Sequence, residues 1–140
     1  MGAKHIRLIY GTLALLLLYV GGNMVYRLLV VKQDEGDPRT QALIQRGQAI
    51  AETCAACHYL DQRTHFVGPN LVSLIGRPIG RAEGYEYSEA LQKQSDNWTP
   101  DKLSAFLANP QQFAPGTKMA LAGWPPADVQ AIVAYLQSKE

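Results

Sequence analysis

The segment CAACH, residues 54–58, constrains this chain more than any other feature of its sequence. Two thiols and an imidazole fall within about one helical turn. Each thiol can add across a vinyl group of haem to form a thioether, and His58 then lies beneath the iron as its proximal ligand. The spacing therefore predicts covalent attachment of one haem c through Cys54 and Cys57.

Three other uses of a Cys-x-x-Cys pair compete with haem attachment. A redox-active dithiol is typical of chains with a βαβ pattern, which this sequence lacks. A structural zinc site needs four ligands, whereas the chain has two cysteines and, besides His58, only His5 and His65. An unlinked pair of buried cysteines leaves the adjoining histidine unexplained. Haem attachment is the favoured interpretation.

Charge is distributed unevenly along the 140 residues. Four of the thirteen basic residues lie in the first 32 positions, where no acidic residue occurs. Nine basic and twelve acidic residues follow Lys32, so the remainder has a net charge of −3. This part of the chain lacks the basic surface that binds phosphate groups, which disfavours a nucleic-acid partner.

An uncharged stretch of nineteen residues, Leu8 to Tyr26, predicts a transmembrane helix. At ~1.5 Å per residue it spans about 28 Å, close to the thickness of a bilayer core. Lys4 and Arg7 precede it, so the positive-inside tendency places the N-terminus in the cytoplasm and the remainder outside. A cleaved signal peptide is the alternative, but the absence of an A-x-A motif favours a retained anchor over residues 1–31.

Residues 32–40, KQDEGDPRT, are polar and interrupted by Gly36 and Pro38, which predicts a linker. Its nine residues reach at most about 30 Å when fully extended. The predicted domain, residues 41–140, is therefore held close to the membrane surface.

Capping residues and helical periodicity predict an all-α domain. Asp37 and Pro38 suit the N-cap and first position of a helix that leads into Cys54. Gly47 on its buried face is either a local weakness or a place where another helix crosses closely, and we favour the crossing. No segment has a clear strand pattern. Further helices are expected from Ser88 to about Gln94, from Pro100 to the Asn109-Pro110 pair and from Pro126 onward, with one helical turn over Leu71–Ile75.

The loop after the CAACH segment contains Gly68-Pro69-Asn70-Leu71, which predicts a turn. The carbonyl group of Pro69 can accept a hydrogen bond from the ring of His58, which would orient the imidazole and raise its basicity. His65 also lies in this loop and is interpreted as a solvated residue rather than a second iron ligand.

A second loop, Pro115 to Met119, supplies the candidate for the other axial position. Its thioether is a soft ligand that raises the reduction potential of haem. Met1 and Met24 lie outside the predicted domain, so Met119 is the only plausible methionine ligand. A core methionine that fills a packing gap is the alternative, but the loop context and the CAACH segment favour ligation.

Residues 41–139 resemble class I cytochrome c, and within it the mitochondrial-type cytochromes c with their membrane-anchored bacterial relatives. The shared motifs are CAACH, GPNL, Gly76-Arg77 followed by GYEYS, Trp98, Asn109-Pro110, PGTKM and the closing Ala134-Tyr135-Leu136. The resemblance implies the all-α cytochrome c fold around one covalent haem.

The resemblance also implies roles for individual residues. His58 and Met119 match the proximal and distal iron ligands. Tyr87 and Trp98 match residues that hydrogen-bond a haem propionate, and Arg77 matches the arginine that compensates its charge. The complete set of matched cofactor-binding residues is Cys54, Cys57, His58, Pro69, Arg77, Tyr87, Trp98, Thr117 and Met119.

Two departures from the family pattern bear on function. Phe106 stands where mitochondrial relatives usually have a tyrosine that bonds the methionine sulfur. The ring of lysines around the haem edge is thin, with Lys118 the main survivor and with Thr53, Gln111 and Pro125 at positions where lysines are expected. Electrostatic steering of a partner should therefore be weak, and tethering to the membrane can replace it.

These observations predict an electron carrier rather than an enzyme, because saturated iron coordination leaves no site for a small-molecule substrate. We expect a single-pass protein of the bacterial inner membrane, with its haem domain in the periplasm. The expected partners are membrane redox complexes: a quinol-oxidising complex, a dehydrogenase or a terminal oxidase. A fixed haem-bearing subunit of a larger oxidoreductase is the main alternative, and a peroxidatic or ligand-binding haem protein would need Met119 to be labile.

Overall fold

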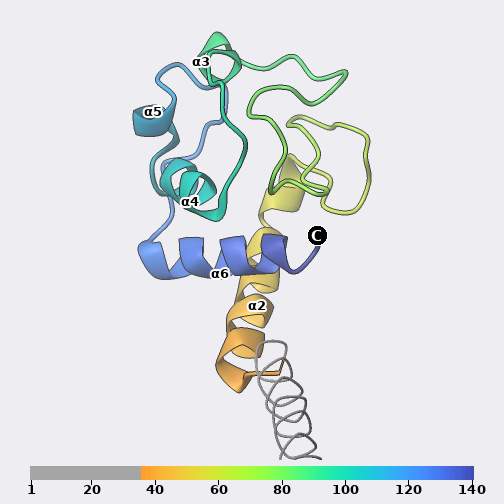
Figure 1. The fold of residues 1–140 in the computed structure, drawn as a ribbon, viewed down its shortest axis with the longest axis vertical. Helices are drawn as coiled ribbons and strands as arrows, with labels where there is room; N and C mark the ends of the chain where they lie inside the picture. The colour runs from red at the N-terminus through yellow and green to blue at the C-terminus, as the bar shows by residue number, and fades with distance from the viewer. Residues whose placement is uncertain (1–35) are drawn as a thin grey trace, which may run out of the picture. The chain divides into compact units, whose positions relative to one another are not determined.

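The computed structural model describes residues 36–140. Contacts within the chain place Gln41–Glu140 in one compact unit. The described residues contain no β-strand, and their one isolated bridge pairs Pro78 with Asn97. The helical elements in Figure 1 are α2 Pro38–Ala51, the 3-10 helix η1 Cys54–Ala56, α3 Glu89–Gln92, α4 Pro100–Ala108, α5 Pro110–Phe113 and α6 Pro126–Gln137.

None of the helices within residues 36–140 combines the length and apolar character needed to cross a bilayer. The predicted anchor, residues 1–31, lies outside the described residues, as does the first part of the predicted linker. The membrane anchor therefore stays a prediction from the sequence.

Helix α2 begins where its capping residues predict. The side chain of Asp37 accepts a hydrogen bond from the backbone N–H of Arg39, at 3.3 Å, and Pro38 is the first helical residue. This pairing satisfies one of the N–H groups that a helix start leaves without an intrahelical partner. The helix ends at Ala51, three residues before Cys54, so the CAACH segment follows it almost directly.

The close helix crossing predicted at Gly47 is present. A Cβ atom at this position would overlap the carbonyl group of Ala131 and come within 2.8 Å of the Cβ of Tyr135, both on α6. Only glycine therefore allows the two backbones to approach this closely. The guanidinium of Arg46 donates to Asp128 at 2.6 Å and joins the same two helices, which pass across one another in Figure 1.

Side-chain caps begin the short helices that follow. Ser88 accepts from the N–H of Leu91 at 3.4 Å, and Thr99 accepts from the N–H of Lys102 at 3.2 Å. Asn109 ends α4 as predicted, but it also accepts from Gln112 at 3.1 Å and begins α5, which the sequence analysis missed. Helix α3 ends at Gln92, two residues earlier than predicted.

The helical turn predicted over Leu71–Ile75 is wrong. Ser73 adopts a left-handed backbone conformation with φ of 47°, which interrupts a right-handed helix. The N–H of Ile75 donates to the side chain of Glu140 at 3.2 Å instead of to a carbonyl one turn earlier. A contact with a residue 65 positions away thus replaces the local hydrogen bond that a helix requires.

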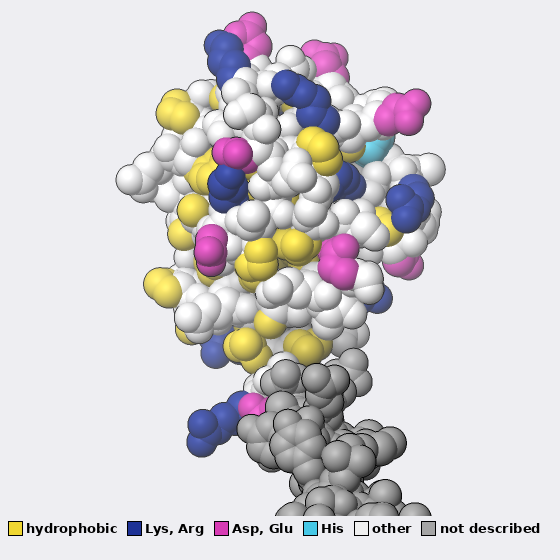
Figure 2. Space-filling model, viewed as in Figure 1, with side chains coloured by type: hydrophobic (Ala, Val, Ile, Leu, Met, Phe, Trp, Pro, Cys, Tyr) yellow, Lys and Arg dark blue, Asp and Glu magenta, His cyan; other side chains and the backbone are white. Residues whose placement is uncertain are grey.

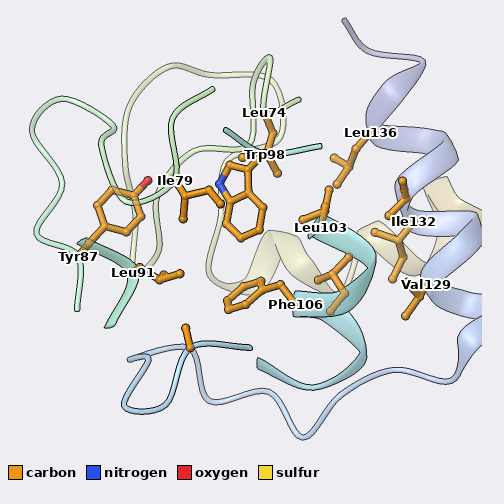
Figure 3. Packing of buried hydrophobic residues seen from close by; sticks show 13 residues of the cluster. Leu74, Ile79, Tyr87, Leu91, Trp98, Leu103, Phe106, Val129, Ile132 and Leu136 are labelled. Atoms are coloured by element: carbon orange, nitrogen blue, oxygen red, sulfur yellow. The ribbon is translucent and has the colours of Figure 1, made fainter. Parts of the chain in front are cut away.

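The core lies where α4 packs against α6 and extends to the loops around Trp98. Each of these two helices buries a row of apolar side chains, as Figure 3 shows for most of them. Burying such side chains contributes ~1.5–3 kcal/mol each. The largest of the buried residues are Leu74, Ile79, Tyr87, Leu91, Trp98, Leu103, Phe106, Leu107, Val129, Ile132, Val133 and Leu136.

Candidate functional site

The CAACH segment forms a single tight turn immediately after α2. Cys54 is half-buried and Cys57 is exposed, and both thiols are free. The backbone N–H groups of Cys57 and His58 both donate to the carbonyl of Cys54, at 3.0 and 2.9 Å. Burial raises the pKa of the Cys54 thiol, and a hydrogen bond from Thr53 opposes this effect. Two free thiols on one turn are the groups that thioether formation needs.

The ring of His58 is oriented by the hydrogen bond predicted from the sequence. Its Nδ1 lies 2.6 Å from the carbonyl oxygen of Pro69, so Nδ1 carries the proton and Nε2 is left with its lone pair. Burial lowers the pKa of His58, with the Pro69 hydrogen bond acting in the opposite direction. The neutral imidazole that metal ligation requires is therefore the favoured form.

Gly68 makes the approach of the histidine ring possible. A Cβ atom at this position would lie 2.6 Å from Nδ1 and 2.8 Å from Nε2 of His58. These separations are shorter than any contact between a real Cβ and a ring atom, so a larger residue would displace the imidazole. The Gly68 N–H also donates to the carbonyl of Cys57 at 2.7 Å, which ties the loop to the attachment segment.

Arg77 is held inside the domain with one donor unused. Its guanidinium donates to the side chain of Asn70 at 3.1 Å and to the backbone carbonyls of Asn70 and Val72 at 2.8 and 3.4 Å. Its Nε atom is buried and has no hydrogen-bond partner within residues 36–140. Burial lowers the pKa of Arg77. A buried donor without a partner is unfavourable, and a carboxylate such as a haem propionate would satisfy it.

Tyr87 and Trp98 are buried in the core, and the backbone N–H of Trp98 donates to the carbonyl of Arg77 at 2.9 Å. They are 7% and 6% exposed, and in Figure 3 the tyrosine hydroxyl and the indole nitrogen are directed toward the same region beside Ile79. Burial raises the pKa of Tyr87, with the charge of Arg77 opposing it, so the phenol stays protonated and able to donate. These positions suit hydrogen bonding to a carboxylate, and that role stays a prediction.

The loop that carries Met119 is ordered by its own side chains. Thr117 is buried, and its hydroxyl accepts from the N–H of Met119 at 3.4 Å. Lys118 donates to the backbone carbonyl and the carboxylate of Glu86, at 3.2 and 3.3 Å. Met119 itself is half-buried and packs against the core. Its ligand role and the cofactor contact of Thr117 stay predictions.

A family model described as Cytochrome c matches residues 44–140. The chain belongs to the cytochrome c family. It is 42% identical over 88 residues to the cytochrome c-type cyt cy of Rhodobacter capsulatus. The aligned stretch covers 62% of this chain and 44% of that protein. It is 39% identical over 100 residues to a cytochrome c homolog of Bradyrhizobium diazoefficiens, covering 69% and 54%. The chain thus spans about half the length of the curated relatives it matches.

Among solved structures, cytochrome cH from Methylobacterium extorquens aligns with a TM-score of 0.63 and 36% sequence identity. The alignment covers 67% of this chain and 96% of that one. Membership of the cytochrome c family implies a covalently bound haem c, and cytochromes c are electron carriers rather than enzymes. The free thiols, the neutral His58 and the unpaired Nε of Arg77 fit this group.

His65 has a structural role in this cytochrome c that the sequence analysis missed. Its Nδ1 accepts from the N–H of Asn70 at 3.1 Å, so Nε2 carries the proton and donates to the carbonyl of Glu83 at 2.8 Å. The ring also packs against Tyr85, with 5.4 Å between centroids. His65 is therefore a bridge between two loops, and both nitrogens are engaged. No local pattern signals this role, because Glu83 lies eighteen residues away.

Replacing His65 by phenylalanine is expected to destabilise the haem-loaded protein by ~1–3 kcal/mol. The change removes both bridging hydrogen bonds and leaves the Asn70 N–H, beside the His58 loop, without its acceptor. Chemical denaturation followed by circular dichroism would measure the loss. Thr64→Ala, at an exposed neighbouring position, is the matched control and should change the stability by less than about 0.5 kcal/mol. Equal stability of both variants would contradict the bridge.

Proposed function

We propose that this cytochrome c is a membrane-anchored, one-haem carrier that passes single electrons between membrane redox complexes. The observation that carries the proposal is the CAACH segment, whose His58 donates a hydrogen bond from Nδ1 to the Pro69 carbonyl and so keeps Nε2 free to bind iron. When bound there, haem supplies a one-electron ferric/ferrous couple. The protein would hold the iron through His58, compensate the charge of a haem propionate through Arg77 and limit the access of water.

The proposal includes axial ligation by His58 and Met119. Support comes from the fixed histidine tautomer and from the half-buried position of the methionine in a loop ordered by Thr117. A histidine and a thioether together fill both axial positions and raise the reduction potential. Iron coordinated in this way exchanges electrons without binding a substrate.

Membrane attachment is proposed from the sequence between Leu8 and Tyr26, whose nineteen uncharged residues suit a single transmembrane helix. The preceding Lys4 and Arg7 favour a cytoplasmic N-terminus and a haem domain on the periplasmic side of a bacterial inner membrane. The linker of residues 32–40 is short, so the domain would search for partners only within a thin layer above the membrane.

The surface supports docking by apolar contact rather than by charge. Figure 2 shows basic and acidic side chains interspersed on one face, with neither sign forming a continuous patch. Lys93, Lys102 and Lys118 are each paired with a carboxylate. Phe66 and Val67 are 55% and 66% exposed, in the loop that Gly68 ties to the attachment segment. An exposed apolar pair at this place fits a partner that is confined to the same membrane and needs little electrostatic steering.

A fixed subunit of a larger membrane oxidoreductase is the second candidate function, and the short linker favours it. Gentle detergent extraction separates the two possibilities. Comigration of this cytochrome with a dehydrogenase, quinol-oxidising complex or terminal oxidase at constant stoichiometry would support the subunit and rule out the free carrier.

A redox titration on native membranes tests the proposed function. The α-band of the reduced cytochrome is followed in two parallel samples, the first given an inhibitor of quinol oxidation and the second an inhibitor of the terminal oxidase. A carrier between these complexes is expected to become oxidised under the first inhibitor and reduced under the second. If neither inhibitor alters its redox state, this respiratory role is excluded.

A further inference from the structure

Gln111 bridges the backbone of the loop that carries Met119. Its side-chain Nε2 donates to the carbonyl of Thr117 at 3.1 Å, and its Oε1 accepts from the N–H of Gly116 at 3.2 Å. One amide group therefore closes a ring across two consecutive residues of the loop. The family resemblance places a lysine at this position, and a lysine side chain has three donors but no acceptor. The double contact is thus a property of the glutamine.

The other restraints on this loop are few. Gly116 has φ of 91°, and nothing in the described part of the chain lies within 4 Å of the place where its Cβ would be, so a side chain here would have no neighbour to pack against. The N–H of Thr117 closes a turn to the carbonyl of Ala114 at 2.9 Å, while the contact between Met119 and the Thr117 hydroxyl is long, at 3.4 Å. The Lys118–Glu86 pair is exposed to solvent, which weakens its contribution.

Gln111 lies on helix α5, which is packed firmly against the core. Asn109 caps the start of this helix, and Pro110 is fully buried. Phe113 at its end packs against Trp98 and Phe106, with centroids 5.8 and 5.5 Å apart. The side chain of Gln111 therefore links a helix that is packed against the aromatic core to the backbone of Gly116 and Thr117, which lie three and two residues before Met119.

We propose that Gln111 is the positioning residue that holds Met119 in place as the sixth ligand. The inference rests on the proposed His58/Met119 ligation and extends it to a residue that does not touch the cofactor. Its consequence is that the population of molecules with Met119 displaced is kept low by one side-chain amide. Removing the amide should raise that population without altering the ligand, the core or the attachment motif.

Imidazole binding to the ferric, full-length protein measures this population, because imidazole enters the sixth position only when the methionine has left it. The apparent affinity equals the intrinsic affinity multiplied by the fraction of open molecules. Losing one or two net hydrogen bonds is expected to raise the imidazole affinity of Gln111→Lys by roughly tenfold. Gln111→Glu keeps the acceptor for Gly116 and loses the donor to Thr117, so its affinity should lie between those of wild type and Gln111→Lys.

Gln112→Lys is the matched control, because it adds the same charge on the neighbouring exposed residue. The side chain of Gln112 makes no hydrogen bond within the described part of the chain, so its imidazole affinity should equal that of the wild type. Amide hydrogen exchange at Gly116 gives a readout that does not depend on the iron. We expect exchange to accelerate in Gln111→Lys and to stay unchanged in Gln112→Lys and Gln111→Glu.

The possible results separate the two proposals. Unchanged exchange and unchanged imidazole affinity in Gln111→Lys would overturn the bridge. Faster exchange with unchanged imidazole affinity would show that the bridge is structural only and would overturn the positioning role. If wild-type protein lacks the spectral signature of methionine ligation, the His58/Met119 proposal itself fails, while the exchange data still report on Gln111.

Discussion

Replacing Cys54 and Cys57 together by alanine should leave a chain that carries no haem after denaturing electrophoresis. The two thioethers are the only covalent links that this sequence offers to the cofactor, since it contains no other cysteine. A haem stain based on peroxidase activity, applied to the denaturing gel, measures the result. Haem that remains on the double variant would contradict covalent attachment through this segment.

Loss of the cofactor should also weaken the fold. Several large apolar side chains are only partly buried at the edge of the core, among them Leu71, Phe113, Leu121 and Trp124. A bound group stabilises the folded state when it binds that state alone. Thermal unfolding of the double variant should therefore occur well below that of the wild type. Ala55→Ser with Ala56→Ser alters the same exposed turn, keeps both thiols and should retain haem.

Replacing Met119 by alanine should lower the reduction potential by ~100 mV or more, within the ~0.8 V range that axial ligands span. The thioether stabilises ferrous haem more than ferric haem, so its removal favours the oxidised form. The sixth position would also become open, and carbon monoxide should bind rapidly to the reduced variant at neutral pH. An equilibrium redox titration and a carbon monoxide binding measurement test the two parts separately.

Leu121→Ala is the matched control for this variant. Leu121 is half-buried against the same core and lies two residues after Met119, but it has no atom that ligates iron. Its potential should change little, and its reduced form should not bind carbon monoxide. If Met119→Ala leaves the potential unchanged, Met119 is not the ligand. If both variants lower it equally, the effect comes from a disordered loop rather than from the lost sulfur.

Features encoded by neighbouring residues could be read from the sequence. Asp37, Ser88 and Thr99 cap the helices that their positions predict, because a cap bonds an N–H two or three residues away. The hydrogen bond between His58 and Pro69 was also predictable, since it spans a short loop that ends in a recognisable turn. Asn109 shows the limit of this reasoning, because its role as a helix stop concealed its second role as a cap.

The attachment segment, the candidate ligands and helices α2, α3, α4 and α6 could be predicted from the sequence, because each is signalled by residues close together along the chain. Two contacts were visible only in the folded chain: His65 bridges two loops, and Glu140 accepts a hydrogen bond from Ile75, 65 positions away. The tertiary structure likewise decided that Arg77 keeps one buried donor unpaired, since burial depends on everything packed around a group. Such contacts depend on the path of the whole backbone, which brings together polar groups that no local pattern pairs.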